Sequence, residues 1–173
     1  MAWDPKICRK INVAFEADDK DEFVRLLSTH PEYLRSEKGT DLWMWCAAQD
    51  GNLSMLQTIV NLGVDINESK DAYNPDDPLL QVEGPILQAA SEGHANVVKW
   101  LLDHGAKINY CVNGKNRCLP LKFAAINGHL EVVKLLVEHG ADVNSTWNGT
   151  TAIQQAETYG HQEIVDYLRP YSS

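Results

Sequence analysis

The sequence has no long apolar run. No window approaches the ~18 consecutive apolar residues that a helix needs to cross a bilayer. The opening stretch, MAWDPKICRKINVAF, also lacks the continuous apolar segment that follows the basic start of a secretory signal. We therefore expect no membrane partner and a cytoplasmic location.

Basic residues are scarce relative to acidic ones. Lysine and arginine together number 15, against 24 aspartates and glutamates, so the formal net charge is −9. A surface of this sign repels the nucleic-acid backbone and anionic lipids, which argues against both as partners. The charge suits a cationic protein partner, and it equally suits a chain that is simply well solvated.

Motifs of catalysis and metal binding are also missing. The chain has no Gly-x-Ser-x-Gly, P-loop or Gly-x-Gly-x-x-Gly motif. Adjacent acids such as Asp18 and Asp19 do not face each other on a helix. The histidines and cysteines are not grouped at the spacing of zinc ligands. We expect no enzymatic activity, no metal and no cofactor.

The cysteines form no C-x-x-C pair, which favours a reducing compartment. Cys111 and Cys118 flank the loop VNGKNR, so a disulfide across it is one alternative and two free thiols are the other. Within the loop, Asn113-Gly114 is a strong signal for a tight hairpin turn.

What the chain does contain is a repeat. Residues 84–109 (GPILQAASEGHANVVKWLLDHGAKIN) align without a gap on residues 119–144 (LPLKFAAINGHLEVVKLLVEHGADVN). The equivalent glycines Gly93 and Gly128 lie 35 residues apart, and further copies surround Gly51 and Gly160. Self-similarity of this period indicates stacked supersecondary units.

A degenerate copy, INVAFEADDKDEFVRLLSTHPEYL, precedes the others. We match four of its apolar residues to the second helix of the fourth copy: Phe23, Val24, Leu26 and Leu27 to Val132, Val133, Leu135 and Leu136.

Each copy has the pattern of two short helices. Pro85 and Pro120 suit the first helical turn, and Thr151 suits the N-cap of the last copy. A glycine that tolerates positive φ ends each first helix, and a buried apolar stripe follows. A second glycine, such as Gly105, ends the second helix before an extended finger. Because no pair could bury its apolar face alone, we expect the copies to stack into one core.

Histidines and tryptophans follow the repeat. His94, His129 and His161 share one repeat position, and His104 and His139 share another. We therefore expect structural roles for these histidines. Met44 and Trp100 fall at core positions. Of Trp43 and Trp45, at least one should be partly exposed.

The segments GHLEVVKLLVEHGADVN (128–144), GHANVVKWLLDHGAKIN (93–109) and GHQEIVDYL (160–168) resemble the ankyrin repeat. The resemblance covers nearly the whole chain, although no copy reproduces the family's Thr-Pro-Leu-His start. It implies an all-α fold, an ankyrin-repeat solenoid of stacked helix-turn-helix units with β-hairpin-like fingers. We expect one domain over 1–173, divided into an N-terminal capping repeat (1–38), repeat 2 (39–67), an inserted acidic finger (68–84), repeat 3 (85–110), repeat 4 (111–144) and a C-terminal capping repeat (145–173).

The resemblance also implies a binding surface, because ankyrin-like proteins generally bind through their fingers and the concave ends of their first helices. The residue pairs before the helix-ending glycines map onto this groove: Gln49, Asp50, Ser91, Glu92, Ile126, Asn127, Thr158 and Tyr159. The finger positions are Lys115, Asn116, Arg117, Trp147, Asn148 and Thr150. Exposed aromatic residues are favoured binding anchors, so we expect contacts from Trp147 and Tyr159. For residues 115–117, a plain surface hairpin is an equal alternative.

The stretch ESKDAYNPDDPLLQVEG (68–84) interrupts the repeat. Gly51 and Gly93 lie 42 residues apart, against 35 for the next pair. Insertions in repeat arrays fall on loops, often on the binding face. We therefore add five candidate binding residues, and packing on the neighbouring fingers is the alternative for them: Tyr73, Asp76, Asp77, Leu79 and Leu80.

These observations predict a non-catalytic module that binds another protein and is monomeric when free. One hypothesis is an immunity protein that neutralises a cationic toxin or enzyme, as small ankyrin-like proteins of bacteria do; it rests on analogy. The alternative is a regulatory or scaffolding adaptor in a signalling or host-directed pathway.

Overall fold

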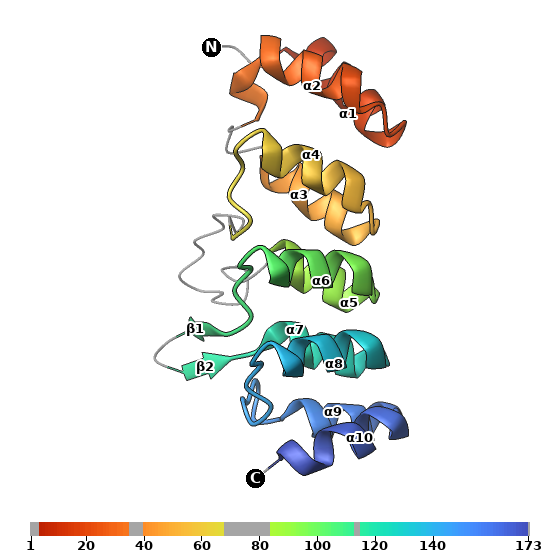
Figure 1. The fold of residues 1–173 in the computed structure, drawn as a ribbon, viewed down its shortest axis with the longest axis vertical. Helices are drawn as coiled ribbons and strands as arrows, with labels where there is room; N and C mark the ends of the chain where they lie inside the picture. The colour runs from red at the N-terminus through yellow and green to blue at the C-terminus, as the bar shows by residue number, and fades with distance from the viewer. Residues whose placement is uncertain (1–3, 35–39, 68–83, 113–114, 173) are drawn as a thin grey trace.

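The computed structural model describes residues 4–34, 40–67, 84–112 and 115–172. Pairs of antiparallel helices stack in a single column from the N-terminus to the C-terminus (Figure 1). Short fingers leave the column on one side, where β1 and β2 form a hairpin. The helix pairs are α1 (Pro5–Glu16) with α2 (Lys20–Thr29), α3 (Thr40–Gln49) with α4 (Leu53–Asn61), α5 (Pro85–Glu92) with α6 (Ala95–Asp103), α7 (Leu119–Ile126) with α8 (Leu130–Glu138), and α9 (Ala152–Tyr159) with α10 (Gln162–Leu168). The remaining elements are the 3₁₀ turns η1 (Pro31–Tyr33) and η3 (Arg169–Tyr171) and the strands β1 (Tyr110–Val112) and β2 (Lys115–Arg117).

The expected all-α solenoid with hairpin-like fingers is confirmed. Within the described part of the chain, no helix is long and apolar enough to traverse a bilayer.

The helix ends follow the local sequence signals. Pro85 is the first residue of α5, and Pro120 lies in the first turn of α7, where a missing N–H costs nothing. Thr151 caps α9 through a reciprocal capping box with Gln154. Gly160 ends the same helix in the left-handed region, with φ of 79°. The predicted start and stop signals are therefore confirmed.

One hydrogen bond defines the register of all five copies. The residue before each second helix donates its backbone N–H, at 2.9 Å, to an alanine carbonyl of the first helix. The donors and acceptors are Asp19 and Ala14, Asn52 and Ala47, His94 and Ala89, His129 and Ala124, and His161 and Ala156.

This register corrects the alignment of the first copy by one residue. Asp18, with φ of 52°, occupies the left-handed position that glycine holds elsewhere. Phe23 consequently matches Val133 rather than Val132, and Glu22 takes the place of Val132. The sequence alignment missed the shift because an aspartate gives a weaker signal for positive φ than glycine does.

The core is one continuous cluster along the column. Small residues such as Ala48, Ala90 and Ala125 let successive first helices approach closely. The first copy has Phe15 at this position. Its ring lies 5.1 Å from the ring of Trp43, centroid to centroid, so aromatic side chains pack between the first and second copies.

One prediction about the core was too simple. Met44 is buried, Trp43 is buried and Trp45 is half-buried, all as expected. Trp100 and its equivalent Leu135, however, are only partly buried at the edge of the core. The Trp100 indole stacks on His104 at a centroid distance of 4.0 Å, because both lie on the solvent side of the second helix.

Two of the fingers contain antiparallel backbone pairing. Cys111 pairs with Asn116 across β1 and β2, and the connecting residues 113 and 114 lie outside the described ranges. In the last copy, Asn148 and Gly149 both have positive φ, as a type I′ turn requires. Cys118 is a free, buried thiol, so the alternative of a disulfide with Cys111 is wrong. Burial raises the pKa of the Cys118 thiol to about 12.

Candidate protein-binding surface

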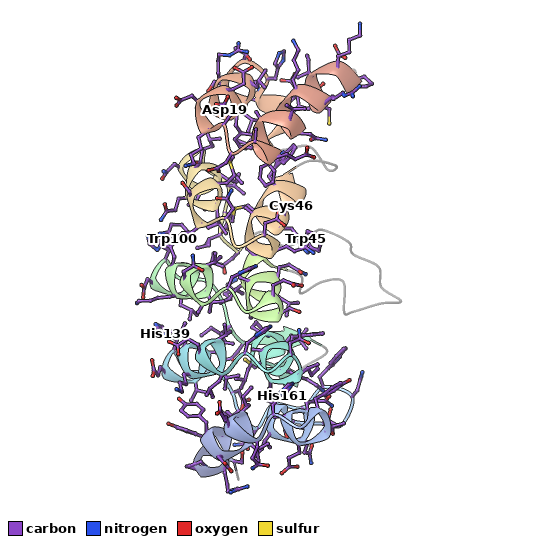
Figure 2. The ribbon with its side chains drawn as sticks, turned by 90° about the vertical axis from the view of Figure 1, so that its right-hand side faces the viewer. Asp19, Trp45, Cys46, Trp100, His139 and His161 are labelled. Carbon is purple, nitrogen blue, oxygen red and sulfur yellow. The ribbon has the colours of Figure 1, made fainter. Side chains whose placement is uncertain are left out.

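The helices divide into two layers. The first helices α3, α5, α7 and α9 pack side by side, and we call them the inner layer. The second helices α4, α6, α8 and α10 form the outer layer behind them. Figure 2 shows the layers side by side, with Trp45 on the inner layer and Trp100 on the outer layer.

Histidines hold the third, fourth and fifth copies each to the copy before it. The backbone carbonyls of Gln49, Ser91 and Ile126 accept hydrogen bonds from the Nε2–H of His94, His129 and His161 respectively, at 2.7 to 2.9 Å. Accepting carbonyls require Nε2 to carry the proton. The predicted structural role of these histidines is confirmed, and the ends of the inner helices are positioned by it.

The same histidines explain the glycines they cover. A Cβ added to Gly93 would lie 2.5 Å from Nδ1 of His129, and one added to Gly51 would meet His94 at the same distance. Both glycines also have positive φ. By contrast, a Cβ on Gly105, which ends an outer helix, would meet nothing within 4 Å. At the ends of α3 and α5, glycine therefore serves both the turn and the neighbouring histidine ring.

The predicted groove residues line the ends of the inner helices. Exposed members alternate with half-buried ones whose carbonyls the histidines hold. The exposed members are Asp50, Glu92, Asn127, Thr158 and Tyr159, and the half-buried ones are Gln49, Ser91 and Ile126. Tyr159 is 58% exposed, among the highest values for a large apolar side chain in the described ranges. The structure thus brings these eight residues into one row.

A small apolar cluster lies apart from the main core. Leu87 of α5 and Leu119 of α7 are buried in it, and Phe123 and Trp147 pack against them while remaining partly exposed. The rings of Phe123 and Trp147 are 5.9 Å apart. The predicted anchor Trp147 is therefore half-buried against the inner layer rather than free on its finger.

The sequence reasoning missed Lys122, which holds this finger in place. Its side chain is only 5% exposed, and Nζ donates to the Trp147 carbonyl at 2.6 Å and to the Thr150 hydroxyl at 2.7 Å. Nζ also lies 5.0 Å from the centre of the Trp147 ring. A lysine at the repeat position of Trp45 and Leu87 was the available signal.

Charge distinguishes the two layers. Lys122 is the single lysine or arginine within the four inner helices, and it is buried. Asp50, Glu92 and Glu157 are exposed along the same layer. The outer helices carry both signs, as in the 3.0 Å pair of Lys99 with Asp103, whose hydrogen bond lowers the pKa of the aspartate.

The structure gives less information about the other candidate residues. Residues 115–117 form β2, which fixes their backbone on the hairpin. Asn148 and Thr150 lie on the last finger, Asn148 exposed and Thr150 bonded to Lys122. Tyr73, Asp76, Asp77, Leu79 and Leu80 fall outside the described residues. No group of three metal-ligating side chains occurs among the residues that the structure describes.

The comparison with protein families agrees with the geometry. A family model described as "Ankyrin repeats (3 copies)" matches residues 44–146 and again residues 86–173. No curated protein matches the chain. Ankyrin repeats are generally protein–protein interaction modules, and members of the family are typically non-catalytic. The matches span most of the sequence, so the chain belongs to the ankyrin-repeat family.

Proposed function

We propose that the protein binds a basic partner protein across the exposed ends of its inner helices and the adjacent fingers. The observation that carries this proposal is the single sign of exposed charge on the inner layer. Among the described residues, Asp50, Glu92 and Glu157 form no salt bridge, and the one base of the inner helices, Lys122, is buried. Unpaired charges of one sign steer a complementary partner and set its register.

The apolar cluster, which lies toward the starts of α5 and α7, supplies the second half of the surface. Phe123 and Trp147 are partly exposed and are fixed from below by Leu87 and Lys122. A rigid aromatic group that needs no reordering on binding loses little conformational entropy. The proposed partner therefore carries apolar side chains next to its basic ones.

An immunity protein is the specific role that we propose. A compact acidic chain that covers the basic active site of a toxin or other cationic enzyme would neutralise it without catalysis of its own. Such a protein would act in the cytoplasm of the bacterium that makes the toxin. The net charge of −9 supports this role.

Affinity capture from the native cell, followed by substitution of the groove, tests the proposal. Tyr159→Ala, Ile126→Ala and Trp147→Ala should each weaken binding of the captured protein, by about tenfold or more for a central anchor. Tyr171→Ala is the matched control, because Tyr171 is 50% exposed and lies on η3, outside the inner layer. Binding that survives all three groove substitutions would contradict the assigned surface.

The immunity role has its own test. Deletion of the gene should make cells sensitive to a toxin encoded beside it, and the chain should block that toxin's activity in vitro. A captured partner that is not toxic, with no loss of protection on deletion, would instead favour a regulatory or scaffolding adaptor.

A further inference from the structure

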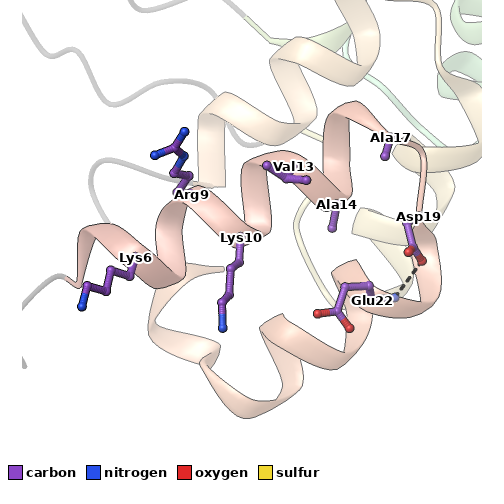
Figure 3. A pocket seen from close by; sticks show the side chains of 8 residues that line it. All are labelled: Lys6, Arg9, Lys10, Val13, Ala14, Ala17, Asp19 and Glu22. Carbon is purple, nitrogen blue, oxygen red and sulfur yellow. Dashed lines mark hydrogen bonds between the residues drawn. The ribbon is translucent and has the colours of Figure 1, made fainter.

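The face of the first helix pair that points away from the second copy is an open stacking surface. A depression of about 600 Å³ lies on it, between α1 and α2 (Figure 3). Val13, at its centre, is 57% exposed. The lining residues are Lys6, Arg9, Lys10, Val13, Ala14, Ala17, Asp19 and Glu22.

The repeat register shows what this face is equivalent to. Lys10 occupies the position of Trp43, and Glu22 the position of Met55. In the second copy, Trp43 and Met55 are buried, and Trp43 packs against Phe15 of the first copy. The first copy thus presents the face that later copies use for stacking, with charged residues around an apolar centre. None of the described residues covers it.

Charge changes sign along this face. Lys6, Arg9 and Lys10 lie toward the start of α1, and Asp19 and Glu22 lie at its far end (Figure 3). Hydrogen bonds from Arg25 lower the pKa of Glu22. Arg25, on the same helix as Glu22, donates to its carboxylate at 2.6 Å, which offsets part of that charge. The Asp19 carboxylate accepts from the Glu22 backbone N–H and forms no salt bridge with any residue that the structure describes.

We propose that this face binds the same face of a second copy of the chain. A two-fold axis crossing α1 near Val13 would set the two α1 helices antiparallel. The basic end of each copy would then meet the acidic end of the other, and the apolar centres would meet at the axis. A surface that is basic at one end and acidic at the other is self-complementary in this arrangement, which is the requirement for an isologous dimer.

The dimer replaces the expectation of a free monomer and leaves the inner layer open for a partner. One helix pair from each copy makes a small interface, so we expect weak association, with a Kd on the order of 10–100 µM.

Sedimentation equilibrium of the full chain, from about 1 to 500 µM, measures this association. Lys10→Glu and Glu22→Lys should each weaken the association at least about tenfold, because each substitution places like charges opposite each other at both symmetry-related contacts. An equimolar mixture of the two variants should associate again, since each mixed pair has opposite charges at both contacts. Lys134→Glu, on the outer layer, is the control and should leave association unchanged.

A chain that stays monomeric at every concentration overturns the proposal, as does a mixture of the two variants that fails to associate. Circular dichroism of each variant establishes that its helices are intact. Because Lys10 and Glu22 lie outside the inner layer, capture of the partner by these variants should match that of the unaltered chain. Failure of the dimer is therefore distinguishable from failure of the proposed function.

Discussion

The inner and outer helices have the same repeat sequence pattern but opposite surfaces. The outer layer carries exposed charges of both signs, and Lys99 pairs with Asp103 within α6. Inner helices carry exposed acids without exposed bases, together with a separate apolar cluster. Paired, mixed charge is what solvation alone requires. Solvation alone does not explain exposed acids without exposed bases together with an apolar cluster, and we infer from this difference that the inner layer binds a partner.

The glycines that end the helices also differ between the inner and outer layers. Those that end inner helices in the second, third and fourth copies lie against a histidine ring of the next copy, and those that end outer helices face open space. Position in the stack, rather than backbone conformation alone, therefore decides what a substitution costs.

The largest expected effect comes from Gly93→Ala. The left-handed backbone costs about 1–2 kcal/mol. Displacement of the His129 ring, with loss of its bond to the Ser91 carbonyl, adds about 1–2 kcal/mol. Denaturant unfolding should show a loss of about 3 kcal/mol, with helicity otherwise retained.

Gly105→Ala is the matched control. Its φ of 86° is close to the 83° of Gly93, but the new methyl group meets nothing within 4 Å. It should lose only the backbone part, about 1–2 kcal/mol. Equal losses for the two variants would show that the histidine contact contributes nothing.

Reversal of the inner acids should have the next largest effect. Asp50→Lys, Glu92→Lys and Glu157→Lys together should weaken partner binding by about 100-fold, equivalent to about 2.7 kcal/mol, mostly through the association rate. Surface plasmon resonance at two salt concentrations measures this. The control reverses three exposed outer acids, Glu131, Glu138 and Glu163, to lysine, with the same change in net charge. If both triple variants lose the same affinity, the net charge and not the inner layer governs binding.

A smaller effect is expected from Lys122→Met. The substitution removes the shortest hydrogen bonds to the Trp147 carbonyl and the Thr150 hydroxyl, which should cost about 1–3 kcal/mol. The carbonyl keeps the Thr150 N–H as a donor, and the hydroxyl keeps Nε2 of Gln155. Lys134→Met on α8 should change stability by no more than about 0.5 kcal/mol. Thermal unfolding compares the two, and Trp147 fluorescence should shift to longer wavelength in Lys122→Met alone. An unchanged spectrum would mean that the lysine does not hold the finger.

The helix boundaries could be predicted from the sequence because they depend on local signals. Pro85, Thr151 and the repeated glycines act through their own backbone geometry, which needs no knowledge of the neighbours. The structural role of His94 could also be predicted, since a histidine that recurs with the repeat is expected to stabilise the fold rather than to bind a ligand.

The surface of the site could be predicted only in part. The row ending at Tyr159 follows from the register, and its exposure agrees with that expectation. The burial of Lys122 depends on a finger that folds back from 25 residues further along the chain, and nothing local to α7 reports it. Trp100 was wrongly expected in the core, because an apolar side chain at the edge of a stripe packs partly and faces solvent partly.

The most direct test of the account is hydrogen–deuterium exchange of the chain with and without its captured partner. Binding across the inner layer should slow exchange at the C-terminal ends of α3, α5, α7 and α9 and in the 145–150 finger, and leave α4, α6 and α8 unchanged. Protection confined to α4, α6 and α8 would contradict it.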